Sequence, residues 1–266
     1  MRERTIELNG QPTRVIEAGG GWPVVLLHAF PMHAGMWRPQ LEHIPQGWRF
    51  VAPDLRGFGP SRPAVSGPLS MTDYASDVEA LLDALQLDRA WVGGVSMGGY
   101  VAFEVFRRIP ERLYGLVLAD TRPEADTPEG REGRRATSEL LLAKGAEALA
   151  DQIVPKLLGE TSRRERNLEP LVRQMVQENG VSGLDAAIHA MRVRPDSTTD
   201  LARITIPTLI LVGDEDRVTP RANSELMQRE IRRSQLVVLP AAGHLSNLET
   251  PERFSAALEN FLTSNI

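Results

Sequence analysis

Short apolar runs alternate with amphipathic stretches along most of the chain. The apolar runs are uninterrupted, as is typical of strands that are covered on both faces of a sheet. They occupy residues 23–28, 49–52, 90–93, 113–118, 207–213 and 236–239. Residues 70–85 carry the clearest helical pattern, with Tyr74, Val78 and Leu82 on one face. Strands that alternate with helices predict a mostly parallel, doubly wound sheet.

The first twenty residues carry a different pattern. Residues 4–8 and 12–17 flank Asn9-Gly10, a pair that favours the tight turn of a β-hairpin. With the six apolar runs, these two segments predict a sheet of eight strands. Thr219-Pro220 and Thr250-Pro251 each predict a helix that begins with a threonine cap and a proline in its first turn.

Residues 122–196 interrupt the alternation. Helical patterns occur at 137–143, 146–158, 163–178 and 184–193, and no segment in this block is a convincing strand. A block of about seventy residues is too long for a loop in such a sheet. We therefore expect residues 1–121 and 197–266 to form the core, and residues 122–196 to form an inserted helical cap.

Composition and charge narrow the function. The net charge is −5 and no dense cluster of Lys and Arg is present, so nucleic-acid binding is not expected. The absence of cysteine excludes disulfides, thiolate nucleophiles and Cys-based metal sites. No apolar run approaches the roughly 20 residues that span a bilayer. The N-terminal residues have no apolar stretch typical of a secretory signal, so we expect a cytoplasmic protein.

The segment Gly94-Val95-Ser96-Met97-Gly98 matches G-x-S-x-G. An apolar run precedes it and a helical pattern follows it, which is the setting of a nucleophile elbow. The glycines suit so sharp a turn, because side chains on either side of the serine would collide across it. We interpret Ser96 as a nucleophile rather than an ordinary loop serine.

A serine hydroxyl needs a base to take its proton and a group to orient that base. His244 follows the last predicted strand, and Asp216 follows the strand before it. The order Ser, Asp, His is the one expected of an α/β-hydrolase triad. Asp214 and Asp120 are the alternative acids, and Asp216 is favoured over both.

Five motifs in order carry a resemblance to a known family. The chain resembles the α/β-hydrolase superfamily, in particular the branch of cofactor-free haloperoxidases, 3-oxoadipate enol-lactonases and small-molecule carboxylesterases. The motifs are Leu27-His28-Ala29-Phe30-Pro31, Asp54-Leu55-Arg56-Gly57-Phe58-Gly59-Pro60-Ser61, Gly93 to Gly99, Gly213 to Asp216 with Thr219-Pro220, and Gly243-His244. The resemblance implies an α/β-hydrolase fold in which Ser96 is the nucleophile, Asp216 the acid and His244 the base. It also implies that the cap covers the pocket.

The attack of a serine creates an oxyanion that needs N–H donors. The backbone N–H of Met97 is one expected donor, and the resemblance implies the N–H of Phe30 as the other. Ala29 stands where the family usually has glycine. We expect Phe30, Met97 and Trp37 to line an apolar acyl pocket, although a core position suits Trp37 equally well.

The predicted reaction is hydrolysis of small carboxylic esters or lactones through an acyl-enzyme, without a cofactor or metal. Perhydrolysis (the cofactor-free haloperoxidase activity) and carbon–carbon bond hydrolysis are the alternatives, and a ligand receptor on the same fold is the non-enzymatic one. Serine at position 96 argues against epoxide hydrolases and haloalkane dehalogenases, which attack with a carboxylate.

Two groups of charged residues are expected to have other roles. The loop at residues 54–61 is predicted to be structural, with Asp54 bonding backbone amides and Arg56 pairing locally. The cap arginines are predicted to form a solvated face. Recruitment of acidic substrates by Arg131, Arg134 and Arg135 is the alternative.

Overall fold

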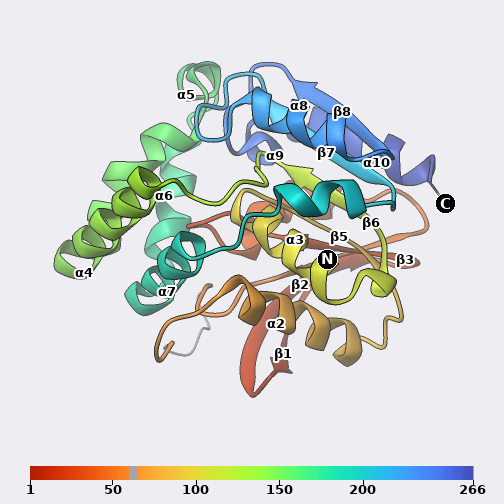
Figure 1. The fold of residues 1–266 in the computed structure, drawn as a ribbon, viewed down its shortest axis with the longest axis horizontal. Coiled ribbons are helices and arrows are strands. Elements are labelled where there is room, and N and C mark those ends of the chain that lie inside the picture. The colour runs from red at the N-terminus through yellow and green to blue at the C-terminus, as the bar shows by residue number, and fades with distance from the viewer. Residues whose placement is uncertain (60–64, 266) are drawn as a thin grey trace.

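The computed structural model describes residues 1–59 and 65–265, and these form one eight-stranded sheet. The strand order is β1-β2-β4-β3-β5-β6-β7-β8 (Figure 1). The strands are β1 (Arg2–Leu8), β2 (Gln11–Gly19), β3 (Trp22–Leu27), β4 (Trp48–Pro53), β5 (Ala90–Val95), β6 (Leu113–Ala119), β7 (Thr208–Gly213) and β8 (Ser234–Leu239). The pairs β1–β2 and β2–β4 are antiparallel and the other pairs are parallel, which confirms the predicted fold class.

The predicted hairpin is confirmed at the edge of this sheet. Leu8 pairs with Gln11, and Asn9 and Gly10 both adopt positive φ, at 49° and 73°. Positive φ at both central positions is the requirement of the tight hairpin turn that Asn-Gly favours.

Helices cover both faces of the sheet. Every residue of β5 and β7 is buried, and because successive side chains of a strand point to opposite faces, both faces must be covered. Figure 1 shows α2 and α3 in front of the sheet, where they pack on each other. The core helices are α1 (Arg38–Glu42), α2 (Met71–Ala84), α3 (Met97–Arg108), α8 (Arg221–Glu230), α9 (Ser246–Glu249) and α10 (Pro251–Thr263), with short 3-10 turns at Ala34–Trp37, Pro110–Arg112 and Thr198–Arg203.

The segment between β6 and β7 carries helices that gather on one side of the molecule, at the left of Figure 1. They are α4 (Pro128–Leu157), α5 (Glu160–Glu165), α6 (Glu169–Gln177) and α7 (Val181–Arg192). Two predicted helices join in α4, which bends at Gly145, where φ is 80° and ψ is −176°. The single helix predicted at residues 163–178 is divided into α5 and α6, and Asn167 between them has a positive φ of 45° that interrupts a helix. We refer to residues 122–196 as the helical insertion.

The two Thr-Pro motifs do not cap helices with their threonine side chains. Pro220 is itself the cap position of α8, and the Thr219 hydroxyl donates to Asp216 instead. At α10 the order of residues is as predicted, with Thr250 at the cap and Pro251 in the first turn. The Thr250 hydroxyl, however, donates to the Ser246 carbonyl, so it does not serve the amides of α10.

Candidate active site

Ser96 lies between the end of β5 and the start of α3, as predicted. Its φ of 54° and ψ of −112° are strained for a residue with a side chain. A Cβ atom at Gly94 would lie 2.5 Å from the Leu27 carbonyl oxygen, and one at Gly98 would lie 2.3 Å from it. The turn therefore requires glycine at both positions, and it raises the serine side chain above the end of the sheet.

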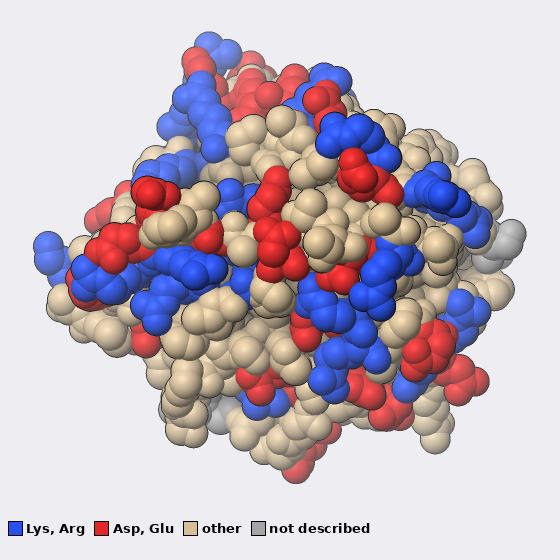
Figure 2. Space-filling model, in the orientation of Figure 1, with Lys and Arg blue, Asp and Glu red and all other residues tan. Residues whose placement is uncertain are grey.

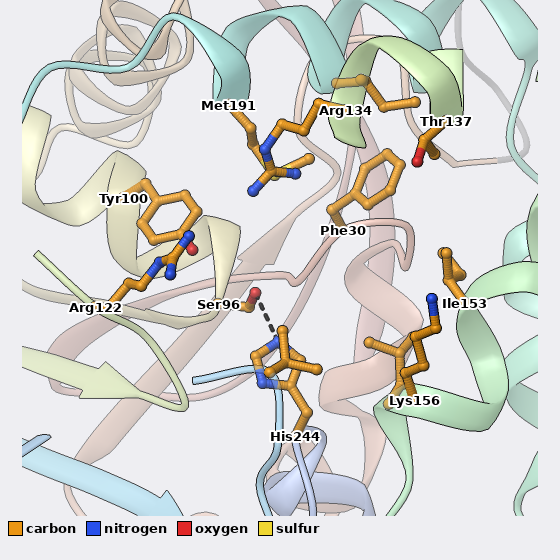
Figure 3. Close-up of a pocket in the computed structure, with 13 residues that line it drawn as sticks. Phe30, Ser96, Tyr100, Arg122, Arg134, Thr137, Ile153, Lys156, Met191 and His244 are labelled. Carbon is orange, nitrogen blue, oxygen red and sulfur yellow. Dashed lines mark hydrogen bonds between the residues drawn. The ribbon is translucent and has the colours of Figure 1, made fainter. Parts of the chain in front are cut away.

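Ser96, His244 and Asp216 form one hydrogen-bonded chain. His244 Nε2 lies 2.8 Å from Ser96 Oγ (Figure 3), and His244 Nδ1 lies 2.9 Å from Asp216 Oδ2. Asp216 follows β7 and His244 follows β8, so the carboxyl ends of adjacent strands bring them together. All three residues are buried.

Three further donors hold the Asp216 carboxylate in place. The Thr219 hydroxyl donates to Oδ2 at 2.7 Å, and the amides of Val218 and Thr219 donate to Oδ1 at 2.8 and 3.0 Å. Burial by itself would raise the pKa of Asp216, but the charge of His244 and these hydrogen bonds outweigh it and lower that pKa. The carboxylate therefore stays ionised beside the imidazole.

The pKa of the His244 imidazole shifts in the opposite direction to that of Asp216. Burial disfavours its charged form, but the Asp216 carboxylate and its hydrogen bond outweigh burial, with smaller effects from Asp120 and Glu249. The net result is a raised pKa for His244, which makes it a stronger base toward the Ser96 hydroxyl.

The two alternative acids lie elsewhere. Asp214 accepts from the Ala241 amide at 2.8 Å in the turn after β8. Asp120 is fully buried, and it accepts from the Gly213 amide at 2.9 Å and from the Ser246 hydroxyl. Burial and the nearby Asp216 charge raise the pKa of Asp120 well above its ordinary value. Of the three acids, Asp216 is the one that bonds His244.

The expected oxyanion donors lie on either side of Ser96. Met97 is the first residue of α3, and Phe30 lies in the loop after β3, where the Phe30–Pro31 peptide bond is cis. Within the described residues, neither amide donates to a protein acceptor. Neither N–H group is therefore occupied by a protein acceptor among the described residues.

His28 has a structural place in the same loop. Its Nδ1 donates to the Ala29 carbonyl at 3.0 Å, and its Nε2 accepts from the Leu55 amide at 2.9 Å. Burial lowers the pKa of His28 to about 4, so the ring is neutral at pH 7. Asp54 bonds the Ala34 amide at 2.8 Å, as predicted.

Arg56, in the described part of the 54–61 loop, has a structural place as well. Arg56 pairs with Asp77 in α2, which agrees with the predicted local pairing. Pro60 and Ser61, which end the motif, lie outside the described residues.

A pocket of about 190 Å³ opens above Ser96 and His244 (Figure 3). Its other lining residues are Phe30, Tyr100, Arg122, Arg134, Thr137, Ile153, Lys156, Leu157, Ile188, Met191 and Val218. Phe30 takes the position expected of it. Trp37 does not line this pocket, because its fully buried ring packs against Phe254 in the core. The side chain of Met97 is also fully buried and does not line it.

Most residues of the pocket wall were not predicted from the sequence. Tyr100 lies one turn into α3, and the wall's cations are Arg122, Arg134 and Lys156. Arg134 thus lines the pocket, contrary to the predicted solvated face. Arg135, its neighbour, does lie on the surface, paired with Glu132 and Glu139. No local pattern distinguishes the two arginines; only the direction of each side chain from the helix does.

Figure 2 shows acidic and basic side chains intermingled over the face it presents. Among the described residues, no group of three or more acidic or histidine side chains is arranged to hold a metal ion. No helix in that part of the chain is long and apolar enough to cross a bilayer.

Comparison with known proteins agrees with this geometry. The family model of the alpha/beta hydrolase fold matches residues 23–251. The chain is 31% identical over 242 residues to 3-oxoadipate enol-lactonase 1 of Acinetobacter baylyi, covering 91% of this chain and 88% of that one. Its fold matches a malate-bound thermophilic esterase from Thermogutta terrifontis with a TM-score of 0.95 and 37% identity, over 100% and 99% of the two chains. It also matches an enol-lactonase from Burkholderia xenovorans with a TM-score of 0.89 and 25% identity, over 98% and 100%. The chain is therefore a member of the α/β hydrolase fold family.

Proposed function

We propose that this protein is a serine hydrolase that cleaves small carboxylic esters or lactones. The observation that carries the proposal is the hydrogen-bonded chain Ser96–His244–Asp216, whose serine faces the pocket. Its relatives include proteins named as an esterase and as enol-lactonases, which supports acyl chemistry. Its substrate is a small molecule, in keeping with a pocket of about 190 Å³.

In the first step, His244 Nε2 takes the proton of Ser96 while Oγ attacks the carbonyl carbon of the substrate. Asp216 stabilises the resulting imidazolium through the 2.9 Å bond to Nδ1. The amides of Phe30 and Met97 donate to the oxyanion that forms. Collapse of this intermediate expels the alkoxide, which takes the proton from His244 and leaves as the alcohol.

In the second step, His244 takes a proton from water, which attacks the acyl-enzyme carbonyl. The tetrahedral intermediate again places its oxyanion against the two amides. Its collapse breaks the bond to Ser96 Oγ, which regains a proton from His244, and the carboxylic acid leaves. The helical insertion acts as a cap in this scheme, because Arg134, Ile153 and Met191 come from it to wall the pocket.

Substitution of the nucleophile tests the proposal. Ser96→Ala is expected to lower kcat for p-nitrophenyl acetate by roughly 10⁴- to 10⁶-fold and to abolish labelling by a fluorophosphonate. Ser255→Ala, on α10, is the matched control and should keep both activities. Unchanged turnover in Ser96→Ala would overturn the triad assignment.

The products separate this function from its alternatives. A hydrolase releases acetate from the ester, whereas a perhydrolase supplied with hydrogen peroxide releases peracetate from the same acyl-enzyme. Labelling of Ser96 without turnover on a broad panel of esters would instead favour a ligand receptor.

A further inference from the structure

The pocket wall is positively charged. Arg122, Arg134 and Lys156 line it, and none of the described residues that line it is an aspartate or a glutamate. Most of the remaining wall is apolar, formed by side chains such as Ile153 and Ile188. Charges beside apolar walls are poorly screened by water, so they interact strongly with a charged ligand.

Arg122 and Arg134 share the carboxylate of Asp126, which also pairs with a third arginine. Asp126 is almost fully buried, and it pairs with Arg122 at 2.8 Å, with Arg134, and with the buried Arg194 at 2.8 Å. Three guanidinium groups and one carboxylate leave two positive charges in excess (3 − 1 = 2). Asp196 offsets part of the charge of Arg194, since its negative charge acts on that residue. Arg122 and Arg134 are left without full compensation.

Two further observations concern the partners of these cations, which for Arg122 include the Tyr100 side chain as well as Asp126. The Nε of Arg122 is buried and has no hydrogen-bond acceptor in the part of the chain that the structure describes. Lys156 forms no ion pair with any described residue. The buried Nε atom is closed to a ligand in the pocket, so an anion there would gain from the attraction of the incompletely compensated charges rather than from a bond to Nε.

The cations surround the nucleophile rather than cluster away from it. In Figure 3, Arg122 lies with Tyr100 on one side of Ser96 and Lys156 lies on the other side, while the guanidinium of Arg134 points into the pocket between Tyr100 and Phe30. A small ligand whose carbonyl lies at Ser96 is thus enclosed by a pocket wall that carries cations on both sides of that serine.

We propose that this pocket recognises a carboxylate, so that the preferred substrates are esters or lactones that carry a second, free carboxylate group. A carboxylate on one side of the ester carbonyl would bind the guanidinium groups of Arg122 and Arg134, and a carboxylate on the other side would bind the ammonium of Lys156, while Ser96 attacks the carbonyl. Arginine suits this role because its planar N–H groups match the two oxygens of a carboxylate. This inference rests on the proposed hydrolase function.

Matched pairs of esters test it with the wild-type protein. Monoethyl succinate and monoethyl glutarate are compared with ethyl isocaproate and ethyl isoheptanoate, in which an isopropyl group replaces the carboxylate. Acetoxyacetate and isobutyl acetate form a third pair, with the charge on the alcohol side. We expect kcat/KM to be at least about tenfold higher for the acidic ester than for the neutral ester in at least one pair. A tenfold ratio corresponds to the free energy of about one charge-assisted hydrogen bond. The preference should fall as salt is added.

Variants identify the residues responsible. Arg134→Met and Lys156→Met should each lower the ratio of kcat/KM between the acidic and the neutral ester by about tenfold, in the pair whose carboxylate that cation binds. Arg135→Met removes an arginine that pairs with surface glutamates one position further along α4, and it should leave the ratio at its wild-type value. A ratio that does not change in either pocket variant would overturn the assignment.

A binding measurement separates this inference from the proposed function. Calorimetry with Ser96→Ala and monoethyl glutarate reports carboxylate recognition without turnover, and ethyl isoheptanoate is the neutral reference. Tighter binding of the acid supports the inference even if no ester is hydrolysed. Hydrolysis of the neutral esters with equal or lower activity on every acid would overturn it, and would leave the serine hydrolase proposal intact.

Discussion

The side-chain amide of Asn179, just after α6, donates to the carbonyl of Pro31 at 2.7 Å. Asn179 is buried, and it also donates to Met32 and Met175 and accepts from the Gly59 amide at 2.8 Å. One side chain of the helical insertion therefore ties together the Phe30 loop and the loop at residues 54–59. The position of the Phe30 amide, the expected oxyanion donor, depends on this contact.

Asn179→Ala should weaken both the fold and the activity. Its removal takes the side-chain donor away from the buried Pro31 carbonyl, which should lower the free energy of unfolding by roughly 3 kcal/mol. A displaced Phe30 amide should lower kcat by about 10- to 100-fold, because oxyanion donors act over short distances. Urea unfolding and ester kinetics measure the two effects. Gln177→Ala, exposed on the same helix, is the control and should alter neither.

The pH profile should report His244. The base must be neutral to accept the serine proton, so kcat/KM should rise with pH through the pKa of His244 and then level off. Because the Asp216 charge raises that pKa, the midpoint should lie above the ordinary histidine value of 6.5. A midpoint well below 6.5 would mean that burial, rather than Asp216, dominates at this site.

Two asparagine variants should separate the candidate acids. Asp216→Asn removes the charge that stabilises the imidazolium, and kcat should fall by about 10⁴-fold with the midpoint of the profile moved to lower pH. Asp120→Asn keeps a group that accepts from Gly213 and faces Ser246, and kcat should stay within about tenfold of wild type. The opposite ranking would assign the acid to Asp120.

The parts of the site that the sequence predicted are those encoded locally. The elbow requires glycine at positions 94 and 98 because neighbouring backbone atoms leave no room for a Cβ atom. This requirement fixes two residues of the sequence, so the elbow can be recognised as a motif. The ends of parallel strands meet at one edge, so motif order predicted that Asp216 and His244 would come together.

The pocket wall could not be predicted in this way. Arg134 and Lys156 lie in the two halves of α4, on either side of the bend at Gly145, and Arg122 precedes that helix, so only the folded insertion brings the three to one pocket. Thr219 was misinterpreted for a related reason. A Thr-Pro pair indicates the start of a helix, where the threonine side chain would bond the helix amides. In the folded chain the Thr219 hydroxyl instead donates to the Asp216 carboxylate, a partner that the Thr-Pro pattern does not indicate. Asn179 belongs to no motif at all.

Acid should destabilise the protein partly through His28. Its pKa is lowered to about 4 in the folded state, whereas the unfolded chain titrates near 6.5, so the unfolded state binds more protons between these values. Stability should therefore fall as pH drops from 6.5 toward 4, by about 3 kcal/mol from this residue. His28→Gln should flatten that part of the curve in urea unfolding. Equal slopes in His28→Gln and wild type would contradict the assignment.

Gly98→Ala, which adds one methyl group at the nucleophile elbow, should lower both the stability and the activity of the protein. In Gly98→Ala the new Cβ would lie 2.3 Å from the Leu27 carbonyl oxygen and 3.1 Å from that of His28, both backbone atoms that cannot rotate away. The end of β3 must shift, and with it the loop that carries the Phe30 amide. We expect the free energy of unfolding to fall by about 3 kcal/mol or more, and kcat to fall with it.

Gly133→Ala is the matched control for this substitution. Gly133 lies in α4 with nothing near the position of an added Cβ. Alanine there should raise the free energy of unfolding by about 1 kcal/mol, since glycine is the poorer helix former, and kcat should not change. Thermal unfolding distinguishes the two variants, with Gly133→Ala melting about 3 °C above wild type. If Gly98→Ala kept wild-type stability and activity, the close approach of Gly98 to Leu27 would not be what shapes the elbow.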